Sequence, residues 1–443
     1  MRIAWETVAP AFVVLVACEA PPDEGALHVQ LSEEIGTVAT VSWHSEADDA
    51  FLEFAGEDGD WRRVAAEAQA DGSWKAMCVG LRQGGDYTLR AGGTLGGSEL
   101  TYAEQTLTAG SAPPELPVLS VVQDEVLNDP GFLAIGVVGD ISWGTLVDAD
   151  GNAVWWYQNP LEDRLSLRLV PSRDGRSVLV GIQRSASPAS NSGLSIHRVA
   201  WDGTVIERIE TPLHHHDFLE LPSGELAWLS DDPREINGTL VHGDTLVVRA
   251  DDDSRREVWN AWDHFAWDDY SPISDFVHAN SLQFDEESGE LWMGLRNADQ
   301  LLRIDPETGE VRSRLFGTDS DLALVSGQAP DGQHNFTLLA DGLLLHDNRP
   351  DEASRIVEYR IDPSAGEVEQ VWEYRADEGY DGAGLGDALR LSSGETIAVW
   401  GSSGVIDRVD ADGAVNARFA APLGSPLGYG VWVSELQPLP PAP

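Results

Sequence analysis

Turns that contain glycine recur along most of the chain, and their spacing restricts the fold more than any other feature. Units of roughly fifty residues combine an inner small-polar-Gly turn with an outer apolar-Asp-x-x-Gly turn, and this period is typical of propeller blades. The inner turns lie at residues 171–175, 221–224, 285–289, 339–342 and 391–394. The outer turns lie at residues 147–151, 200–203, 304–309, 361–366 and 409–413, with a less regular one at 250–253. This pattern predicts an all-β, six-bladed β-propeller over residues 119–436, whose closed ring leaves only short, protected sheet edges.

A separate β domain is predicted ahead of the repeats, over residues 25–110. Residues 38–43 alternate between apolar and polar side chains like a half-buried strand, and residues 50–54 and 74–79 are further predicted strands. Residues 81–90, which include Tyr87, resemble the tyrosine corner of immunoglobulin-like and fibronectin type III domains. We therefore expect a small immunoglobulin/fibronectin type III-like β-sandwich, joined to the propeller by the Pro-rich linker at residues 111–118.

The chain is strongly acidic, with 28 Lys and Arg against 75 Asp and Glu and a formal net charge of -47. A field of this sign repels nucleic acid and anionic lipid, which excludes both as partners. Lys75 is the only lysine. An anionic substrate must therefore be bound by arginine side chains close to it.

The N-terminus has the features of a secretory signal. Residues 8–17 form an apolar stretch that is too short to cross a bilayer, which favours a signal peptide over residues 1–17. The sequence Leu-Val-Ala-Cys at residues 15–18 resembles the lipobox of bacterial lipoproteins, in which the cysteine is lipidated. We expect Cys18 to carry a lipid anchor and the protein to reside in the periplasm or cell envelope. Nucleotide-derived donors are scarce in such a compartment.

Histidines occur at the same place in three successive repeats. His278 begins a predicted hairpin that continues through Asn280, turns at 287–289 and returns to Arg296. The run at residues 214–216 and His334 each stand just before the inner strand of their own repeat. Because such positions face one another across a propeller channel, we expect these side chains to converge on one site with Arg296.

These residues resemble those of the bacterial arylsulfate sulfotransferases. The resemblance covers residues 119–433 and is carried by five elements: His278-Ala-Asn280, Arg296, the His-His-Asp element at 215–217, Gln333-His334, and the stretch from Leu345 to Tyr374. It implies a six-bladed propeller behind a small β domain in an exported enzyme. Such enzymes move a sulfuryl group from a phenolic sulfate ester to a phenol and need neither a nucleotide donor nor another cofactor.

The resemblance also implies roles for individual residues. His334 is the nucleophile and forms a sulfohistidine, Arg296 binds the oxygens of the sulfuryl group, and Asn280 orients a sulfate oxygen or the nucleophile. His278 or a histidine of the 214–216 run serves as acid and base. Alignment against the neighbouring repeats leaves His215 and His216 equally placed for this role.

Two positions depart from the family pattern. Asn335 stands where an aspartate usually follows the nucleophile, so a neutral amide replaces a charge that could orient the imidazole. His346 stands where an aromatic residue is expected, and we interpret it as a packing substitute.

Two other functions fit the same histidines. Converging imidazoles could hold zinc or copper, which would make the chain a metal-binding propeller. The propeller could instead bind a ligand or a partner protein without catalysis. Arg296 favours sulfuryl transfer without a metal, because a metal site has no use for a cation among its ligands.

Overall fold

The computed structural model describes residues 25–57, 59–124, 131–162, 164–184, 194–380, 382 and 384–439. The predicted signal peptide and Cys18 lie outside these residues. The described chain consists of β-strands in eight four- or five-stranded sheets, so the prediction of an all-β protein is confirmed. The helical elements of the described residues are one four-residue α-helix, α1 (Ala261–His264), and four short 3-10 helices.

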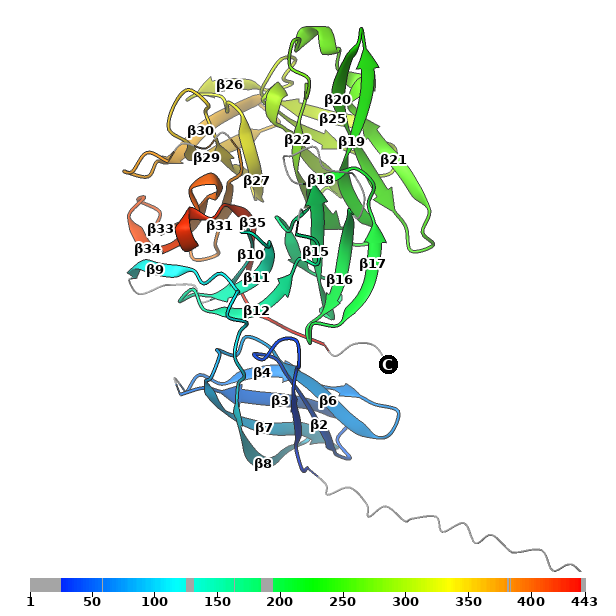
Figure 1. Cartoon of the computed structure of the whole chain (residues 1–443), viewed down its shortest axis with the longest axis vertical. Helices are drawn as coiled ribbons and strands as arrows, with labels where there is room; N and C mark the ends of the chain where they lie inside the picture. Colours follow the sequence, from blue (N-terminus) through cyan, green and yellow to red (C-terminus); the bar gives the residue numbers. More distant parts are fainter. Residues whose placement is uncertain are drawn as a thin grey trace, which may run out of the picture.

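The N-terminal part consists of two four-stranded sheets that pack face to face (Figure 1). The first contains β1 (His28–Leu31), β2 (Ala39–His44), β6 (Ser73–Cys78) and β5 (Glu67–Ala68). The second contains β4 (Arg62–Ala65), β3 (Asp49–Ala55), β7 (Asp86–Leu95) and β8 (Ser98–Thr108). Alternate residues of both sheets, among them Trp43, Phe54 and Leu89, form their shared core. The Tyr87 hydroxyl accepts a hydrogen bond from the Arg82 N–H, 2.7 Å away, which is the local contact expected of a tyrosine corner.

Six sheets follow between residues 120 and 433 and surround a common centre (Figure 1). The first four contain the following strands: β10 (Phe132–Val137), β11 (Trp143–Asp148), β12 (Ala153–Gln158) and β35 (Leu427–Val433); β13 (Arg164–Leu165), β14 (Leu169–Pro171), β15 (Ser177–Arg184), β16 (Ser195–Ala200) and β17 (Val205–Glu210); β18 (His214–Glu220), β19 (Leu226–Ile236), β20 (Thr239–Arg249) and β21 (Arg255–Asn260); β22 (Ala279–Asp285), β23 (Glu290–Leu295), β24 (Gln300–Ile304) and β25 (Val311–Leu315).

The last two sheets have five strands each. They contain β26 (Ala323–Ser326), β27 (Gln333–Leu339), β28 (Gly342–Asp347), β29 (Arg355–Asp362) and β30 (Glu367–Tyr374); and β31 (Asp387–Arg390), β32 (Thr396–Trp400), β33 (Val405–Val409), β34 (Val415–Ala420) and β9 (Ser120–Asp124). The hairpins between these strands lie at the predicted turns. At the turn between β22 and β23, for example, Gly289 adopts a φ of 73°, which favours glycine.

The innermost strands form a closed ring. Neighbouring pairs run from β18 to β22, β27, β31 and β35, and β35 in turn contacts β14. The ring closes because β15, which pairs with β14, contacts β18. Both ends of the region are joined to the sheet at its opposite end, because β35 pairs with β10 and β9 pairs with β34. This pairing removes two strand edges that would otherwise be open to association with other chains.

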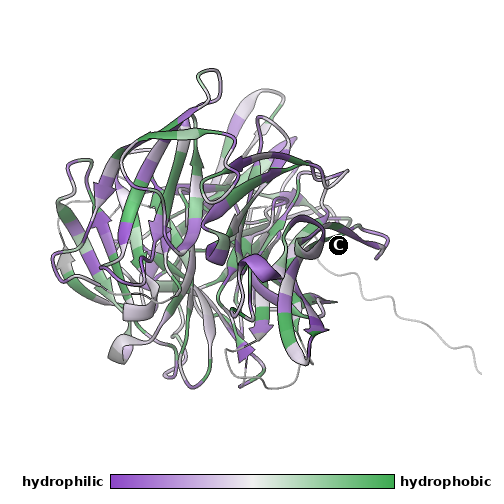
Figure 2. Cartoon of the chain, turned by 90° about the horizontal axis from the view of Figure 1, so that it is seen from above, coloured by the Kyte–Doolittle hydropathy of each residue, from purple (hydrophilic) through white to green (hydrophobic). Residues whose placement is uncertain are grey.

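The two parts of the molecule share a continuous core. Ile35, Val38 and Met77 from the sandwich pack against Trp155 and Trp201 of the ring. Hydrogen bonds cross the same contact, including one from the Thr37 hydroxyl to the Val154 carbonyl at 2.8 Å. Figure 2 shows hydrophobic (green) and hydrophilic (purple) segments side by side within single sheets.

Candidate active site

His334 lies near the start of β27, and its side chain is buried close to the centre of the ring. Its Nδ1 lies 3.2 Å from the main-chain carbonyl of Gly386. A carbonyl can only accept, so Nδ1 carries the proton and Nε2 keeps its lone pair. The ring of Tyr429, from β35, stacks on the imidazole at a centroid distance of 5.2 Å and an angle of 17°. These contacts fix both the tautomer and the plane of the imidazole.

Two further histidines meet His334 from the neighbouring sheets. The ring of His216 lies 5.9 Å from that of His334 and 4.7 Å from that of His278, measured between centroids. Arg296 is close enough for its charge to lower the pKa of His334, and its Nη2 lies 3.7 Å from the position of a Cβ on Gly332. We call His216, His278, His334 and Arg296 the histidine–arginine cluster. The sequence predicted that His278, His334 and Arg296 converge with a histidine of the 214–216 run, without choosing which one.

The imidazole of His334 is held in its neutral form. Burial lowers its pKa well below the ordinary value, and the nearby His346, His278 and Arg296 lower it further, against the hydrogen bond to Gly386. Burial, with His278 and His215 as neighbours, also lowers the pKa of His216. A neutral imidazole with a free Nε2 lone pair is a nucleophile at neutral pH.

The hairpin of β22 and β23 brings His278 and Arg296 together, as predicted from the sequence. The Arg296 N–H donates to the His278 carbonyl at 2.9 Å. Nη1 of Arg296 donates to Oδ1 of Asn297 at 2.7 Å, and Nδ2 of Asn297 donates to the carbonyl of Asp275 at 2.6 Å. Asp275 also lies 2.6 Å from Nδ1 of His278 through its Oδ2. The sequence analysis missed Asp275 and Asn297, although both lie within three residues of a predicted site residue.

The three histidines at the start of β18 have different surroundings. His214 is buried and packs edge-on against Phe218, so it belongs to the core. Nε2 of His215 lies 3.0 Å from Oδ1 of Asp244 on β20, and its Nδ1 lies 2.8 Å from Nδ1 of His216. His216 alone of the three has a ring contact with His278 and with His334. His216 therefore lies inside the histidine–arginine cluster, and His215 lies behind it.

Asn280 supports the strand that carries His334. Its side chain is buried, and its Nδ2 donates to the carbonyl of Gln333 at 2.8 Å. Its main-chain carbonyl accepts a hydrogen bond from the hydroxyl of Tyr429 at 2.7 Å. The amide that was expected to orient a sulfate oxygen or the nucleophile thus contacts the main chain next to His334.

Asn335 belongs to a hydrogen-bonding pattern that occurs three times in the ring. Asp217, Asn335 and Asp387 each accept, through Oδ1, the N–H of the residue that follows. The Asn335 side chain also forms a hydrogen bond with the buried carboxyl of Asp387. Burial raises the pKa of Asp387 to about 7. The repeated pattern makes His216, His334 and Gly386 equivalent positions.

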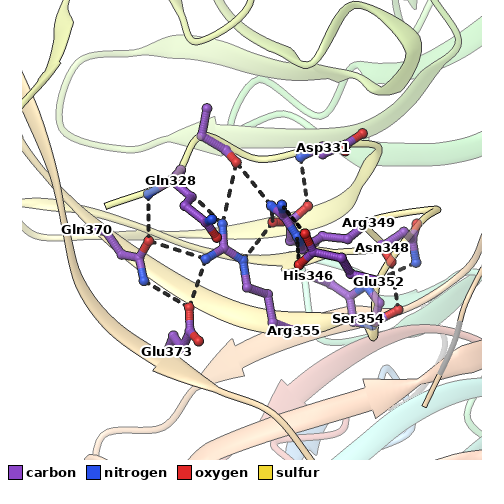
Figure 3. A network of polar contacts seen from close by, with 12 residues as sticks. Gln328, Asp331, His346, Asn348, Arg349, Glu352, Ser354, Arg355, Gln370 and Glu373 are labelled. Carbon is purple, nitrogen blue, oxygen red and sulfur yellow. Dashed lines mark hydrogen bonds and ion pairs between the residues drawn. The ribbon is translucent and has the colours of Figure 1, made fainter. Parts of the chain in front are cut away.

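A buried ion-pair network anchors the loop that leads into His334 (Figure 3). The guanidinium of Arg355 is fully buried and donates to Asp347 at 2.8 Å, to Glu373 at 2.8 Å and to the carbonyl of Gln328 at 3.1 Å. Asp347 in turn accepts the N–H of Asp331 at 2.8 Å. The network therefore ties residues 328–331 to β28, β29 and β30.

His346 packs in the interior close to His334. Its ring contacts Trp400 edge-on at 5.5 Å, and burial lowers its pKa to about 3. The side chain is thus a neutral ring among aromatic neighbours. Among the residues that the structure describes, no group of three or more His, Cys, Asp or Glu side chains is arranged to hold a metal ion.

Comparisons with known proteins bear on these residues. A family model described as Arylsulfotransferase (ASST) matches residues 140–383, more than half of the chain. A search of curated proteins finds no match. Within the described residues, no helix has the length and apolar character needed to cross a membrane.

Several solved structures are similar at low identity. Virginiamycin B lyase from Staphylococcus aureus is 15% identical over 68% of this chain and 88% of its own, with a TM-score of 0.38. The periplasmic gluconolactonase of Pseudomonas aeruginosa is 15% identical over 87% of this chain and 99% of its own, with a TM-score of 0.43. A chain of a nidogen/laminin complex is 14% identical over 69% of this chain and 99% of its own, with a TM-score of 0.43. Because these identities and TM-scores are low, the description of the fold rests on the strand pairing given above.

Proposed function

Because the chain belongs to the arylsulfotransferase (ASST) family, we propose that it transfers a sulfuryl group between phenols through a sulfohistidine at His334. Family membership implies aryl-sulfate sulfotransferase activity with a small-molecule sulfate donor and acceptor. The observation that carries the proposed mechanism is the hydrogen bond from His334 to Gly386, because it leaves Nε2 as the free nitrogen of a neutral ring.

In the first half of the reaction, Nε2 of His334 attacks the sulfur of a phenolic sulfate ester. The N–S bond forms as the bond from sulfur to the aryl oxygen breaks, and the phenolate that leaves takes a proton from a histidine of the cluster. The ring of His334 then carries the sulfuryl group on Nε2 and a proton on Nδ1, and the carbonyl of Gly386 stabilises that charge. In the second half, the oxygen of an acceptor phenol attacks sulfur, the N–S bond breaks, and the proton of the phenol returns to the cluster.

Arg296 is the cation that fits the transferred group. Three oxygens share negative charge during the transfer, and a guanidinium offers them a fixed set of donors. This local charge matters in a chain with a net charge of -47, which repels an anionic ester elsewhere on its surface. No nucleotide takes part in this scheme.

The wider architecture is part of the proposal. We assign the six sheets over residues 119–436 as blades of a six-bladed β-propeller, behind an immunoglobulin/fibronectin type III-like sandwich at 25–110 and a linker at 111–118. The closed ring of inner strands and the pairing of β35 with β10 support this assignment. We further assign residues 1–17 as a signal peptide and Cys18 as the lipidated N-terminus of an exported protein. Mass analysis of the mature N-terminus tests this last assignment: an unmodified Met1 would rule it out.

An assay with a chromogenic aryl sulfate and a phenol acceptor tests the function. The wild-type protein should release the coloured phenol and form the sulfated acceptor in equal amounts. With donor alone, a peptide that contains His334 should gain the mass of a sulfuryl group. His334→Ala should abolish both signals. The control is His197→Ala, which should preserve them, because His197 is bonded to Tyr157 and lies outside the cluster. A label on His278 or His216 would contradict the assignment of the nucleophile.

A further inference from the structure

Two hydrogen bonds link a carboxylate to the histidine–arginine cluster in one continuous line. Oδ1 of Asp244 lies 3.0 Å from Nε2 of His215, and Nδ1 of His215 lies 2.8 Å from Nδ1 of His216. The ring of His216 then meets those of His278 and His334. We propose that Asp244, His215 and His216 form a proton relay, in which His216 protonates the leaving phenolate and His215 replaces the proton. This inference rests on the proposed function.

The geometry defines where each proton lies. Only one proton can occupy the line between the two Nδ1 atoms, so one ring donates and the other accepts. Burial and the neighbouring His278 and His215 lower the pKa of His216, so this ring is the neutral acceptor. An imidazole that accepts at Nδ1 carries its proton on Nε2, and this nitrogen is the one available to a group bound in the cluster.

The surroundings of His215 favour its charged form. Burial opposes protonation, but the hydrogen bond and charge of Asp244, with further charges on Asp231 and Asp275, outweigh burial and raise the pKa of His215. The side chain is 13% exposed, so little water competes with Asp244 for the ring. The other titratable neighbours are His214 and His216 on the same strand, and burial lowers the pKa of both.

The proton movements balance. As the bond from sulfur to the aryl oxygen breaks, Nε2–H of His216 passes its proton to the phenolate while Nδ1–H of His215 passes its proton to Nδ1 of His216. His215 is left neutral, with its remaining proton on Nε2 facing Asp244. When the acceptor phenol attacks, its proton enters at Nε2 of His216 and the one on Nδ1 returns to His215.

Asp244 has a second contact that suits this role. Its Oδ2 accepts the N–H of Ala279 at 2.9 Å, next to His278. The carboxylate is thus fixed by β22 as well as by its own strand, β20. It orients His215 without contact to the reacting atoms, so it is a positioning residue.

The relay predicts an effect that depends on the leaving group. Phenol has a pKa near ~10, so phenyl sulfate needs a proton donor, whereas 4-nitrophenolate is a much weaker base and leaves without one. Asp244→Asn and His215→Asn should each lower kcat/KM for phenyl sulfate by about 100-fold or more and that for 4-nitrophenyl sulfate by less than about fivefold. The control is His197→Asn, which removes a buried histidine that is bonded to Tyr157 and lies outside the cluster. It should leave the ratio of the two donors unchanged.

The pH profile gives a second readout. His215 acts when it is protonated, so kcat/KM for phenyl sulfate should fall as the pH rises through the pKa of His215. In Asp244→Asn this fall should move to lower pH, because the charge that raises this pKa is gone. Imidazole ¹⁵N shifts of the wild-type protein, followed over pH, should show that His215 keeps its second proton to a higher pH than His216.

The outcomes separate the two proposals. An active wild-type enzyme whose Asp244→Asn and His215→Asn variants lose both donors equally would overturn the relay and leave the proposed function intact. ¹⁵N shifts that show His215 losing its second proton at a lower pH than His216 would also overturn it, even if a variant fails to fold. Failure of the wild-type protein to release phenol from either donor would overturn the proposed function, and the relay with it.

Discussion

Gly386 lies directly against the ring of His346: a Cβ on Gly386 would be 2.5 Å from Cε1 of His346. The same glycine holds Nδ1 of His334 through its carbonyl and adopts a φ of 123°, which favours glycine. His346 therefore does more than fill space beside Trp400. It sets how close the main chain that holds Nδ1 of His334 can lie.

Substitution of Gly386 should impair the chemical step. In Gly386→Ala the new methyl group forces the carbonyl or the His346 ring to move, so Nδ1 of His334 loses its fixed acceptor. We expect kcat to fall by roughly 10- to 100-fold with little change in KM, because the defect lies in orientation and not in binding. Gly384→Ala is the control, since a Cβ there meets nothing within 4 Å and should leave kcat unchanged. Equal kcat values for the two variants would contradict the role of Gly386.

The hydrogen bond from the Asn335 amide to the Asp387 carboxyl should contribute to the stability of the folded protein. Asn335→Asp replaces a hydrogen-bond donor with a second carboxylate beside a buried acid whose pKa is already raised to about 7. The pKa of Asp387 in the folded protein lies above its ordinary value of 3.8, so the unfolded chain loses this proton first as the pH rises. The stability that this group contributes is therefore complete below pH 3.8, the ordinary pKa, and is lost as the pH rises to about 7, the pKa in the folded protein.

Asn335→Asp should strengthen this dependence. We expect the variant to be destabilised more at pH 8 than at pH 5, which denaturant unfolding at the two pH values would measure. The exchanged pair Asn335→Asp with Asp387→Asn should recover most of the loss, because one donor again faces one carboxylate. A loss that is the same at both pH values, or that the exchange does not reduce, would argue against a paired role.

The sequence predicted the positions of the turns because each depends on local chemistry. Gly289 shows this: its positive φ and the alternation on either side define the hairpin of β22 and β23 without reference to the rest of the chain. The same hairpin places Arg296 beside His278, so this part of the site followed from local pairing as well.

The choice between His215 and His216 could not be made from alternation. The pairing of β18 with β19 shifts register between His214 and Phe218, and His216 has a φ of 55°, so successive side chains no longer alternate between two faces. Asp244 and Tyr429 were missed for another reason. Asp244 reaches His215 from β20, two strands away in the same sheet, so its place depends on how that sheet pairs. Tyr429 comes from the last strand of the chain, which only the closed ring brings to the site.

The buried network of Figure 3 should be a large source of stability. Arg355→Met removes the cation shared by Asp347 and Glu373 and leaves the buried Asp347 with less compensation. We expect the free energy of unfolding of the ring to fall by about 3–5 kcal/mol. Denaturant titration would measure this loss. Arg360→Met on the same strand is the matched control. Its side chain is 56% exposed in a pair with Glu369, and its removal should cost less than about 1 kcal/mol.

The shape of the Arg296 guanidinium, as well as its charge, should be needed for sulfuryl transfer. Asn297 holds one end of the group through Nη1 and is itself held by the carbonyl of Asp275, so the plane of the guanidinium is fixed relative to His278. Lysine keeps the charge but has neither the planar set of donors nor a partner that orients it. The oxygens of the sulfuryl group gain most from such donors in the transition state, when charge spreads over them.

Arg296→Lys should therefore lower the rate of sulfohistidine formation in a single turnover by about 100-fold, while donor binding weakens much less. Arg312→Lys is the control, because Arg312 lies outside the site in exposed pairs with Asp305 and Glu310. A lysine variant with the wild-type rate would mean that charge alone suffices. In that case the transferred group would be held by main-chain donors or histidines, and Arg296 would act only by attracting the anionic donor to an otherwise acidic protein.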